Sequence, residues 1–600
     1  MKHSPLQLQL FVIAACGFAV LVGGFFFPKP PGSDVLDLLR FALMIALLLT
    51  LSWSALRAWS KREALPAPPT PEQAGLLPRA AAFLGHPLTL TVLLAGVLAS
   101  VAFATQNRAI YNDEAIWHYV GRAWLRSGLL PYTGTFENKT PGIFYLFAVS
   151  DWLAGVNFWL PRLFGILVSA LTGLGIYAIG RRLAGRSVGL LALLLYGLTT
   201  ADPRSMDAPF TAQTETFMLG FTVLAAWLLV ATRQAASFRA HVAIIFLAGL
   251  SLGGAIAFKQ TALVSLLGLL LFYLSLKAPH ARTAGAVARD CLVCAAGVAL
   301  ATFASLVPLL LSGVSVADYL HGAWQMLGGA GSSVSSWLIR WNRLMFTLES
   351  PVLQMYMLLL GVLLLLYRRL PAAVPLVGLM GWYVCELIAV NASGTYWPHQ
   401  LRQALPPLAL LGGIAWWALI KANLTREPAL CWPHYALIGL SIALIWTPPL
   451  GWWPLSSQSR AAREAYTWIR EHTEAQDYVY TFGVMSANQI LVNAERRSSS
   501  RYFTQYFLNT PGVEAEVRRD LAAKPPKYIV MESGRSLSIT EDLTVPQWVD
   551  ALVADAYHLE KRITYTQKTT IDDQMTSGFL IYRRNASAAD KSRPAGNSAE

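Results

Sequence analysis

Long apolar stretches recur from the start of the chain to about residue 454, separated by short polar connections. About thirteen of them approach the roughly 17–25 residues that a helix needs to cross a bilayer. They lie at 7–27, 36–56, 87–105, 162–180, 188–201, 213–231, 241–258, 261–276, 291–311, 351–367, 373–391, 404–420 and 434–450. The pattern predicts a polytopic α-helical membrane module over 1–454. The first stretch is expected to be a retained span, because it lacks a small-residue cleavage site.

The last quarter of the chain has a different character. Acidic and basic residues are equally numerous there, and helix-like stretches alternate with short β-type runs at 478–482, 528–531 and 579–582. This pattern predicts an α/β domain over 455–585, which is long enough to bury its own core. Residues 586–600 are rich in Ala, Ser, Asp and Lys, a composition that predicts a disordered tail.

The composition agrees with a membrane protein. The 600 residues are 55% hydrophobic and 14% charged, whereas soluble proteins carry about 25% charged residues. These values exclude a mainly soluble enzyme, a disordered scaffold and a disulfide-rich module. The net charge of +13 could indicate a nucleic-acid partner or basic cytoplasmic loops of a membrane protein. The placement of the basic residues decides between these two interpretations.

Basic residues gather in alternate connections between the predicted spans. They lie at 57–79, 181–186, 233–239, 277–289, 368–369 and 421–426. This is the positive-inside pattern, and it predicts a cytoplasmic N-terminus and no nucleic-acid partner. A loop at 106–161, another at 312–350 and the whole C-terminal domain are then expected on the exterior side.

Cofactor motifs are scarce. Cys291 and Cys294 have a metal-like spacing, but no second pair accompanies them, and two small side chains on one helix face account for them. No nucleotide-binding motif occurs in a supporting context. A membrane enzyme of this kind takes its activated substrate from elsewhere, and the lipid phase is one source.

The exterior loop at 106–161 begins with two adjacent carboxylates, Asp113 and Glu114. Aromatic residues at helical spacing follow, among them Trp117 and Tyr119, and predict an amphipathic helix lying on the membrane. The carboxylates can simply cap that helix. The alternative is that one of them is a general base in a partly desolvated cleft.

Lys139 follows in the same loop, just before Pro141 and an aromatic run. It is either an interfacial lysine whose ammonium reaches water or a ligand for an anionic leaving group. Glu215 and Glu386 lie within or at the ends of apolar spans, where an unpaired charge costs roughly 2.5–3.5 kcal/mol. They are therefore either functional or paired with a cation.

Taken together, these segments resemble the GT-C type membrane glycosyltransferases, and more narrowly the bacterial relatives of protein O-mannosyltransferases and lipid A aminoarabinose transferases. The resemblance covers most of residues 90–420. It rests on Asp113-Glu114, Lys139-Thr140-Pro141, Arg162-Leu163, the Thr-Glu-Thr-Phe run at 214–217, the Phe-Lys-Gln-Thr run at 258–261 and the segment at 396–406. The family more often has two prolines after the lysine, so this turn departs from its pattern.

The resemblance implies transfer of a sugar from a polyprenyl-phosphate carrier to an extracytoplasmic acceptor, with inversion at the anomeric carbon. The acceptor is a cell-envelope glycan, a lipid or a protein. The implied roles are a base for Asp113, a carboxylate that orients Asp113 or holds the acceptor for Glu114, and donor-phosphate binding for Lys139, His399, Arg402, Lys259 and Arg162. The other cavity candidates are His118, Glu215 and Tyr396. Asp113, Glu114 and His118 offer metal ligands, but a lipid monophosphate requires none, so no metal or other cofactor is expected.

The implied location is the bacterial cytoplasmic membrane, with the C-terminal domain outside. A transporter is the main alternative; it would place charges near the midplane and often in repeated halves, whereas here they collect at outer span ends. An envelope glycan ligase or polymerase would also use exterior Arg and His. A non-catalytic assembly partner is the remaining possibility.

Overall fold

The computed structural model describes residues 112–201, 212–280, 283–326, 351–366, 370, 374–392, 398–424, 457–483, 487–508, 510–533, 547–568 and 574–586. Four of the predicted spans, at 7–27, 36–56, 87–105 and 434–450, lie outside these residues. Tyr396 also lies outside them.

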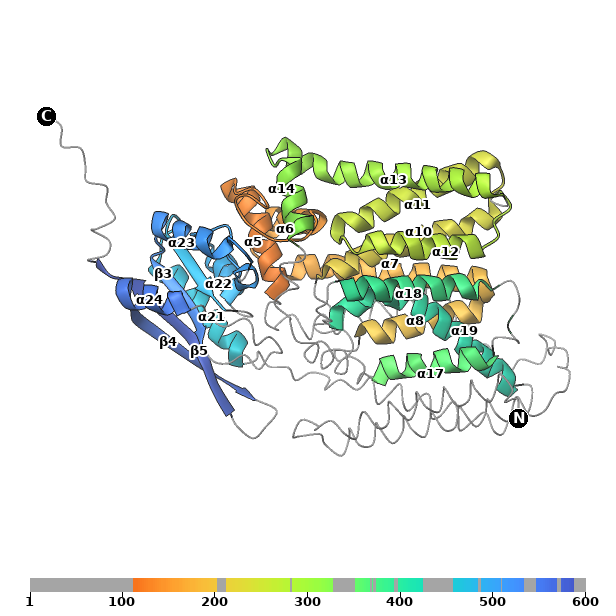
Figure 1. Cartoon of the computed structure of the whole chain (residues 1–600). Coiled ribbons are helices and arrows are strands. Elements are labelled where there is room, and N and C mark those ends of the chain that lie inside the picture. Colours follow the sequence, from red (N-terminus) through yellow and green to blue (C-terminus); the bar gives the residue numbers. More distant parts are fainter. Residues whose placement is uncertain are drawn as a thin grey trace, which may run out of the picture.

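Every predicted span between residues 162 and 420 coincides with a helix. The helices lie side by side in a bundle (Figure 1). They are α7 (Trp159–Ala184), α8 (Arg186–Ala201), α10 (Thr214–Ala231), α11 (Phe238–Phe258), α12 (Ala262–Ser275), α13 (Ala284–Leu311), α17 (Pro351–Leu366), α18 (Leu376–Ala392) and α19 (Leu405–Leu424). Among the described residues, four helices are long and apolar enough to cross a membrane: Trp159–Ala184, Thr214–Gln234, Phe238–Phe258 and Ala284–Leu311.

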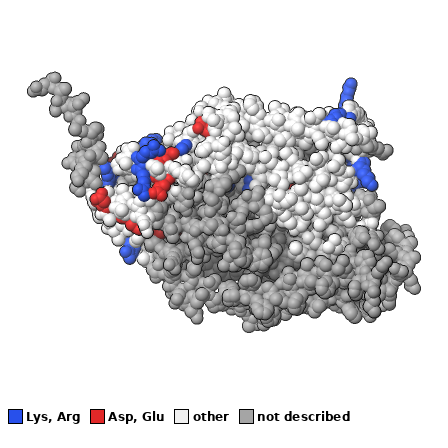
Figure 2. Space-filling view, in the orientation of Figure 1, with Lys and Arg blue, Asp and Glu red and all other residues white. Residues whose placement is uncertain are grey.

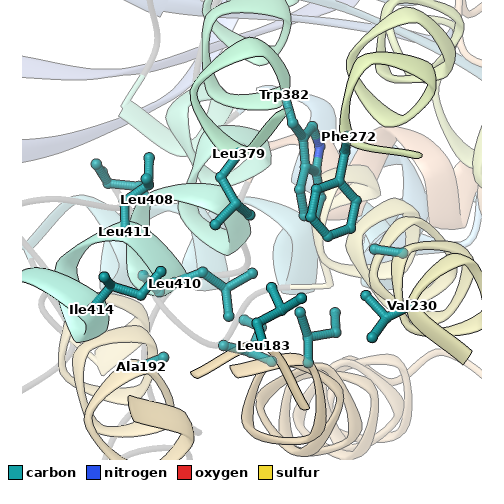
Figure 3. Packing of buried hydrophobic residues seen from close by; sticks show 14 of the residues in the cluster. Leu183, Ala192, Val230, Phe272, Leu379, Trp382, Leu408, Leu410, Leu411 and Ile414 are labelled. Atoms are coloured by element: carbon teal, nitrogen blue, oxygen red, sulfur yellow. The ribbon is translucent and has the colours of Figure 1, made fainter. Parts of the chain in front are cut away.

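The bundle buries a core and also exposes apolar side chains. Figure 3 shows Phe272 of α12 beside Trp382 of α18, with ring centroids 5.7 Å apart. On the outside, Leu292 and Phe303 of α13 are 73% and 60% exposed. The visible described face of the bundle carries few charged side chains (Figure 2). An apolar outer face of this extent indicates an apolar surrounding rather than water.

Close backbone contact joins α11 and α13. A Cβ atom at Gly249 would lie 2.1 Å from the carbonyl oxygen of Cys294, and one at Gly297 would lie 2.4 Å from that of Phe246. Small residues allow membrane helices to approach in this way. Cys294 therefore belongs to a helix contact, and Cys291 and Cys294 are both free thiols.

Short helices lie at one end of the bundle, toward the C-terminal residues (Figure 1). They are α5 (Asn112–Ser127), α6 (Gly142–Ala154), α14 (Val316–Leu320) and the π-helical turn η3 (His321–Gln325). Trp117 and Tyr119 of α5 are 1% and 5% exposed. The prediction that these aromatic residues face the membrane is therefore wrong, because protein covers them.

The C-terminal residues form a mixed sheet with helices, which we call the C-terminal unit (457–586). Its elements are α21 (Ser457–His472), β1 (Tyr478–Phe482), α22 (Ala487–Ala494), β2 (Arg497–Ser498), η6 (Gln505–Phe507), α23 (Val513–Ala523), β3 (Tyr528–Ser533), α24 (Gln547–Ala556), β4 (Tyr557–Lys568) and β5 (Gln574–Arg584). The strand order is β2-β1-β3-β5-β4. β1 pairs in parallel with β2 and β3, whereas β5 is antiparallel to β3 and β4. Each β-type run of the sequence lies within a strand.

The C-terminal unit packs directly on α5. The Tyr119 hydroxyl accepts a hydrogen bond from the backbone N–H of Ser498 (2.8 Å), and its ring lies 4.5 Å from that of Phe503. Arg122 forms an ion pair with Glu495 of the same unit. Helix α5, which carries Asp113 in its first turn, is thus held between the bundle and the C-terminal unit.

Candidate active site

The buried carboxylate of Glu114 fixes the start of α5. Arg162, near the start of α7, donates from Nη2 to Oε2 (2.6 Å) and from Nε to Oε1 (3.0 Å). The backbone N–H of Ala212, just before α10, donates to Oε1 at 2.7 Å. Glu114 and Arg162 thus satisfy each other's charge. A substrate phosphate, the expected partner of Arg162, would have to compete with this pair.

Asp113, the residue before Glu114, is partly buried near Lys139. The Lys139 ammonium donates to Asn138 Oδ1 (3.0 Å) and to Glu137 Oε1 (3.3 Å). Burial lowers the pKa of Lys139, but the carboxylates of Glu137, Asp113 and Glu215 outweigh it and raise the pKa above 10.5. The structure therefore brings a charged lysine and the Asp113 carboxylate into one electrostatic environment.

Glu215 lies next to two of the predicted phosphate ligands, Lys259 and His399. The residue lies in the first turn of α10 and is buried. It forms an ion pair with Lys259, the residue that ends α11. His399, in the 3-10 helix η5 (Pro398–Ala404), lies 3.8 Å from Glu215 Oε1 through Nε2. Three candidates far apart in the sequence thus meet at one point, because α10 begins where α11 ends.

Arg402 contacts the same turn of α10. It is 4% exposed and donates from Nη1 to Thr216 Oγ1 at 3.1 Å. Its neighbour Gln403 accepts a hydrogen bond from Thr261 (3.0 Å) and donates to the carbonyl oxygen of Glu386 (3.2 Å). The turn at 398–404 therefore carries His399 and Arg402 to Glu215 and Thr216.

His118 lies in a different group. Its Nε2 is 3.4 Å from Asp151 Oδ1, and the ring packs between Phe147 and Phe158. Asp151 is fully buried and also accepts from Arg122 (2.6 Å) and Arg126 (3.0 Å). His118, a cavity candidate in the sequence, thus helps to join α5 to α6.

Asp151 was not among the residues predicted from the sequence. The signal was present, because His118, Arg122 and Arg126 recur every four residues and so share one face of α5. Such a face favours an acidic partner on a neighbouring element, and Asp151 supplies it.

Gln213 is a second residue that the sequence analysis passed over. It is fully buried directly before α10, and neither atom of its amide has a hydrogen-bond partner in the described part of the chain. Buried polar atoms are nearly always paired. Gln213 therefore has one donor group and one acceptor to offer to a hydroxyl group or a water molecule. In the sequence, Gln213 could have been recognised as a site candidate because it directly precedes the Thr-Glu-Thr run at 214–216.

These residues share one end of the bundle. Asp113, Glu114, Arg162, Glu215 and Lys259 all lie at the helix ends nearest α6 and the C-terminal unit. The opposite ends carry the arginines at 181–186 and 233–239, and Figure 2 shows basic side chains there. Across the described ranges, no group of three or more His, Cys, Asp or Glu side chains is arranged to hold a metal ion.

Known proteins resemble this chain in one segment of its sequence and in its fold. Residues 138–308 match the family model described as dolichyl-phosphate-mannose-protein mannosyltransferase. The structure resembles that of ArnT from Cupriavidus metallidurans bound to undecaprenyl phosphate, with 15% identity, a TM-score of 0.53 and coverage of 84% of this chain and 98% of that chain. Its apo state gives 14% identity, a TM-score of 0.52 and the same coverage. Comparison with curated protein sequences gives no match.

A weaker structural likeness is to the oligosaccharyltransferase AglB from Archaeoglobus fulgidus in complex with an inhibitory peptide and a dolichol-phosphate. It has 12% identity and a TM-score of 0.48, and covers 74% of this chain and 69% of that chain.

The likeness to ArnT extends over most of both chains and shows a shared fold. Residues 138–308 carry the sequence pattern of the mannosyltransferase family model. That segment begins at Asn138 and includes Lys139, Arg162, Glu215 and Lys259, so it spans much of the candidate site.

Proposed function

We propose that the chain transfers a sugar from a polyprenyl-phosphate donor to an acceptor outside the cytoplasm. The observation that carries the proposal is the convergence of Lys139, Lys259, His399 and Arg402 with the Asp113 carboxylate at one end of an apolar bundle. A lipid phosphate needs cations at the membrane boundary, and an acceptor hydroxyl needs a base beside them.

In the proposed reaction, the acceptor oxygen attacks the anomeric carbon while the bond from that carbon to the phosphate oxygen breaks. Asp113 takes the proton of the acceptor hydroxyl. Polyprenyl phosphate leaves with the bonding electrons, and Lys139 and Arg402 stabilise its added negative charge. Attack from the face opposite the phosphate inverts the anomeric configuration.

The other candidates have supporting roles. Lys259 and His399 are held by Glu215, which keeps both near the phosphate position. Glu114 and Arg162 fix the start of α5 and hence the backbone that carries Asp113. The reaction needs no divalent metal, since a monophosphate leaving group can be neutralised by the protein's own cations.

The proposed location is the bacterial cytoplasmic membrane. The arginine-bearing helix ends face the cytoplasm by the positive-inside rule, so the candidate site and the C-terminal unit face the exterior. An envelope glycan ligase or polymerase remains the second candidate, favoured by the same exterior His399 and Arg402.

The test uses the purified full chain in liposomes with radiolabelled sugars on undecaprenyl phosphate and with envelope glycan, lipid and peptide fractions as acceptors. We expect label in one acceptor class, stoichiometric release of undecaprenyl phosphate and an inverted anomeric linkage. Label that crosses the vesicle membrane without release of the carrier would instead identify a transporter and refute the proposal.

A further inference from the structure

Tyr132, in the loop between α5 and α6, has an unusual backbone. Its φ is 69°, in the left-handed region that residues with a side chain seldom adopt. The residue is only 2% exposed. Its ring lies against Gly322 of η3 so closely that a Cβ atom there would be 2.5 Å from Tyr132 Cδ1. A conformation of this kind persists only where the surroundings hold it, and it commonly marks a functional position.

Tyr132 has hydrogen bonds on two sides. Its hydroxyl donates to the carbonyl oxygen of Lys139 (2.7 Å), seven residues later in the same loop. Its own carbonyl oxygen accepts from Nη1 of Arg501, in the C-terminal unit, at 3.1 Å. The backbone N–H of Phe136 in turn donates to the carbonyl oxygen of Arg501 (2.9 Å). Arg501 of the C-terminal unit thus hydrogen-bonds to the loop at Tyr132 and at Phe136. Tyr132 in turn hydrogen-bonds to the backbone of Lys139, so it links Arg501 to Lys139.

Arg501 is itself fixed in place. It donates to Glu516 of α23 from Nε (2.6 Å) and from Nη2 (2.9 Å), and its guanidinium lies 4.8 Å from the ring centroid of Tyr502. The third direction of the planar guanidinium is then left for the Tyr132 carbonyl. A lysine has no such fork and cannot make these contacts together.

We infer that Arg501 and Tyr132 are positioning residues, through which the C-terminal unit sets the place of the Lys139 ammonium. The inference rests on the proposed function, in which Lys139 binds the donor phosphate. The Lys139 backbone is held by Tyr132, and its Nζ is held by Asn138 and Glu137. Such support of a binding group reduces the reorganisation needed to bind the ligand. The C-terminal unit therefore contributes to donor affinity without touching the donor.

The test measures the dissociation constant for undecaprenyl phosphate on the purified full chain, by native mass spectrometry in detergent. Tyr132→Phe removes one hydroxyl and keeps the ring, so the fold is preserved. We expect about fivefold weaker binding, the effect of one hydrogen bond. Arg501→Gln should weaken binding at least as much, and Arg501→Lys should not restore it.

Two matched controls separate positioning from general stiffening. The Tyr145 hydroxyl also donates to a backbone carbonyl, that of Ser305 (2.6 Å), away from Lys139. Arg518 also pairs with a glutamate and lies over a ring, 4.7 Å from the Trp548 centroid, but among the described residues it has no hydrogen bond to the loop between α5 and α6. Tyr145→Phe and Arg518→Gln should bind undecaprenyl phosphate as the wild type does.

A double-mutant cycle completes the test. In a Lys139→Gln background, Tyr132→Phe should have no further effect, because the group that it positions is gone. If Tyr132→Phe binds as tightly as Tyr145→Phe, or weakens binding equally with and without Lys139, the positioning role is wrong while the proposed function stands. If the wild type binds no undecaprenyl phosphate, the proposed function and this inference both fail.

Discussion

Arg162 and Glu114, 48 positions apart in the sequence, form a buried ion pair with three hydrogen bonds, which joins the start of α7 to the start of α5. Asp113 is the residue next to this pair, so the pair determines where the proposed base lies. Removing one partner of a buried ion pair leaves the other charge desolvated and uncompensated.

Glu114→Gln should therefore destabilise the protein by about 3–5 kcal/mol. A combined change of Glu114→Gln and Arg162→Met should cost less than the sum of the two single changes. Thermal unfolding in detergent measures both effects. The exposed pair of Glu514 and Arg518 is the control, and Glu514→Gln should change stability by roughly 0.3–0.5 kcal/mol. Equal losses at the two sites would contradict the structural role of Glu114.

A raised pKa keeps Lys139 charged at alkaline pH. The charge-dependent part of donor binding is complete below the usual pKa of 10.5 and is lost only as the pH rises through the higher value in the folded protein. The donor KM should therefore be constant up to about pH 10. Lys139→Gln should raise the donor KM about 10- to 100-fold, the effect of a charge-assisted hydrogen bond, and Lys139→Arg less. A wild-type KM that begins to rise near neutral pH would argue against the charged lysine.

Asp151 provides a comparison between a buried and an exposed partner of the same arginine. Asp151→Asn leaves Arg122, Arg126 and His118 without their buried acceptor and should cost about 3–5 kcal/mol. Glu495→Gln removes the partner of Arg122 whose side chain is 41% exposed and should cost roughly 0–1 kcal/mol. Unfolding curves of both variants measure these losses of stability. A larger loss for Glu495→Gln than for Asp151→Asn would contradict the assignment of Asp151 as the main partner of Arg122.

The sequence predicted the spans between residues 162 and 420 because helix length and apolar content are local properties. It also placed Asp113 at the start of a helix, Lys139 in the loop before Pro141, and Glu215 within or at the end of a span, where an unpaired charge is costly. It did not indicate that Arg162 pairs with Glu114, or that His118 pairs with Asp151, because these contacts depend on which helices are neighbours. The left-handed backbone of Tyr132 and its link to Arg501 arise from packing between distant segments, which no local pattern encodes.

Metal removal tests whether the proposed sugar transfer needs a divalent metal ion. Since Lys139, Arg402 and Lys259 can neutralise a leaving monophosphate, sugar transfer should continue in EDTA at an unchanged rate. Initial rates with and without added Mg²⁺ or Mn²⁺ provide the measurement. A rate that falls to background in EDTA and returns with one of these ions would show that a metal takes part.

Asp113→Asn tests the central claim most directly, because asparagine has nearly the same shape in the first turn of α5 but cannot accept the acceptor's proton. Asp318, the acidic residue of the capping box that begins α14, provides the matched control. In the liposome assay, we predict that Asp113→Asn binds undecaprenyl phosphate and unfolds like the wild type, yet transfers sugar at least 100-fold more slowly, as expected for loss of a general base. Asp318→Asn should transfer at the wild-type rate. Transfer by Asp113→Asn at the wild-type rate would contradict the account.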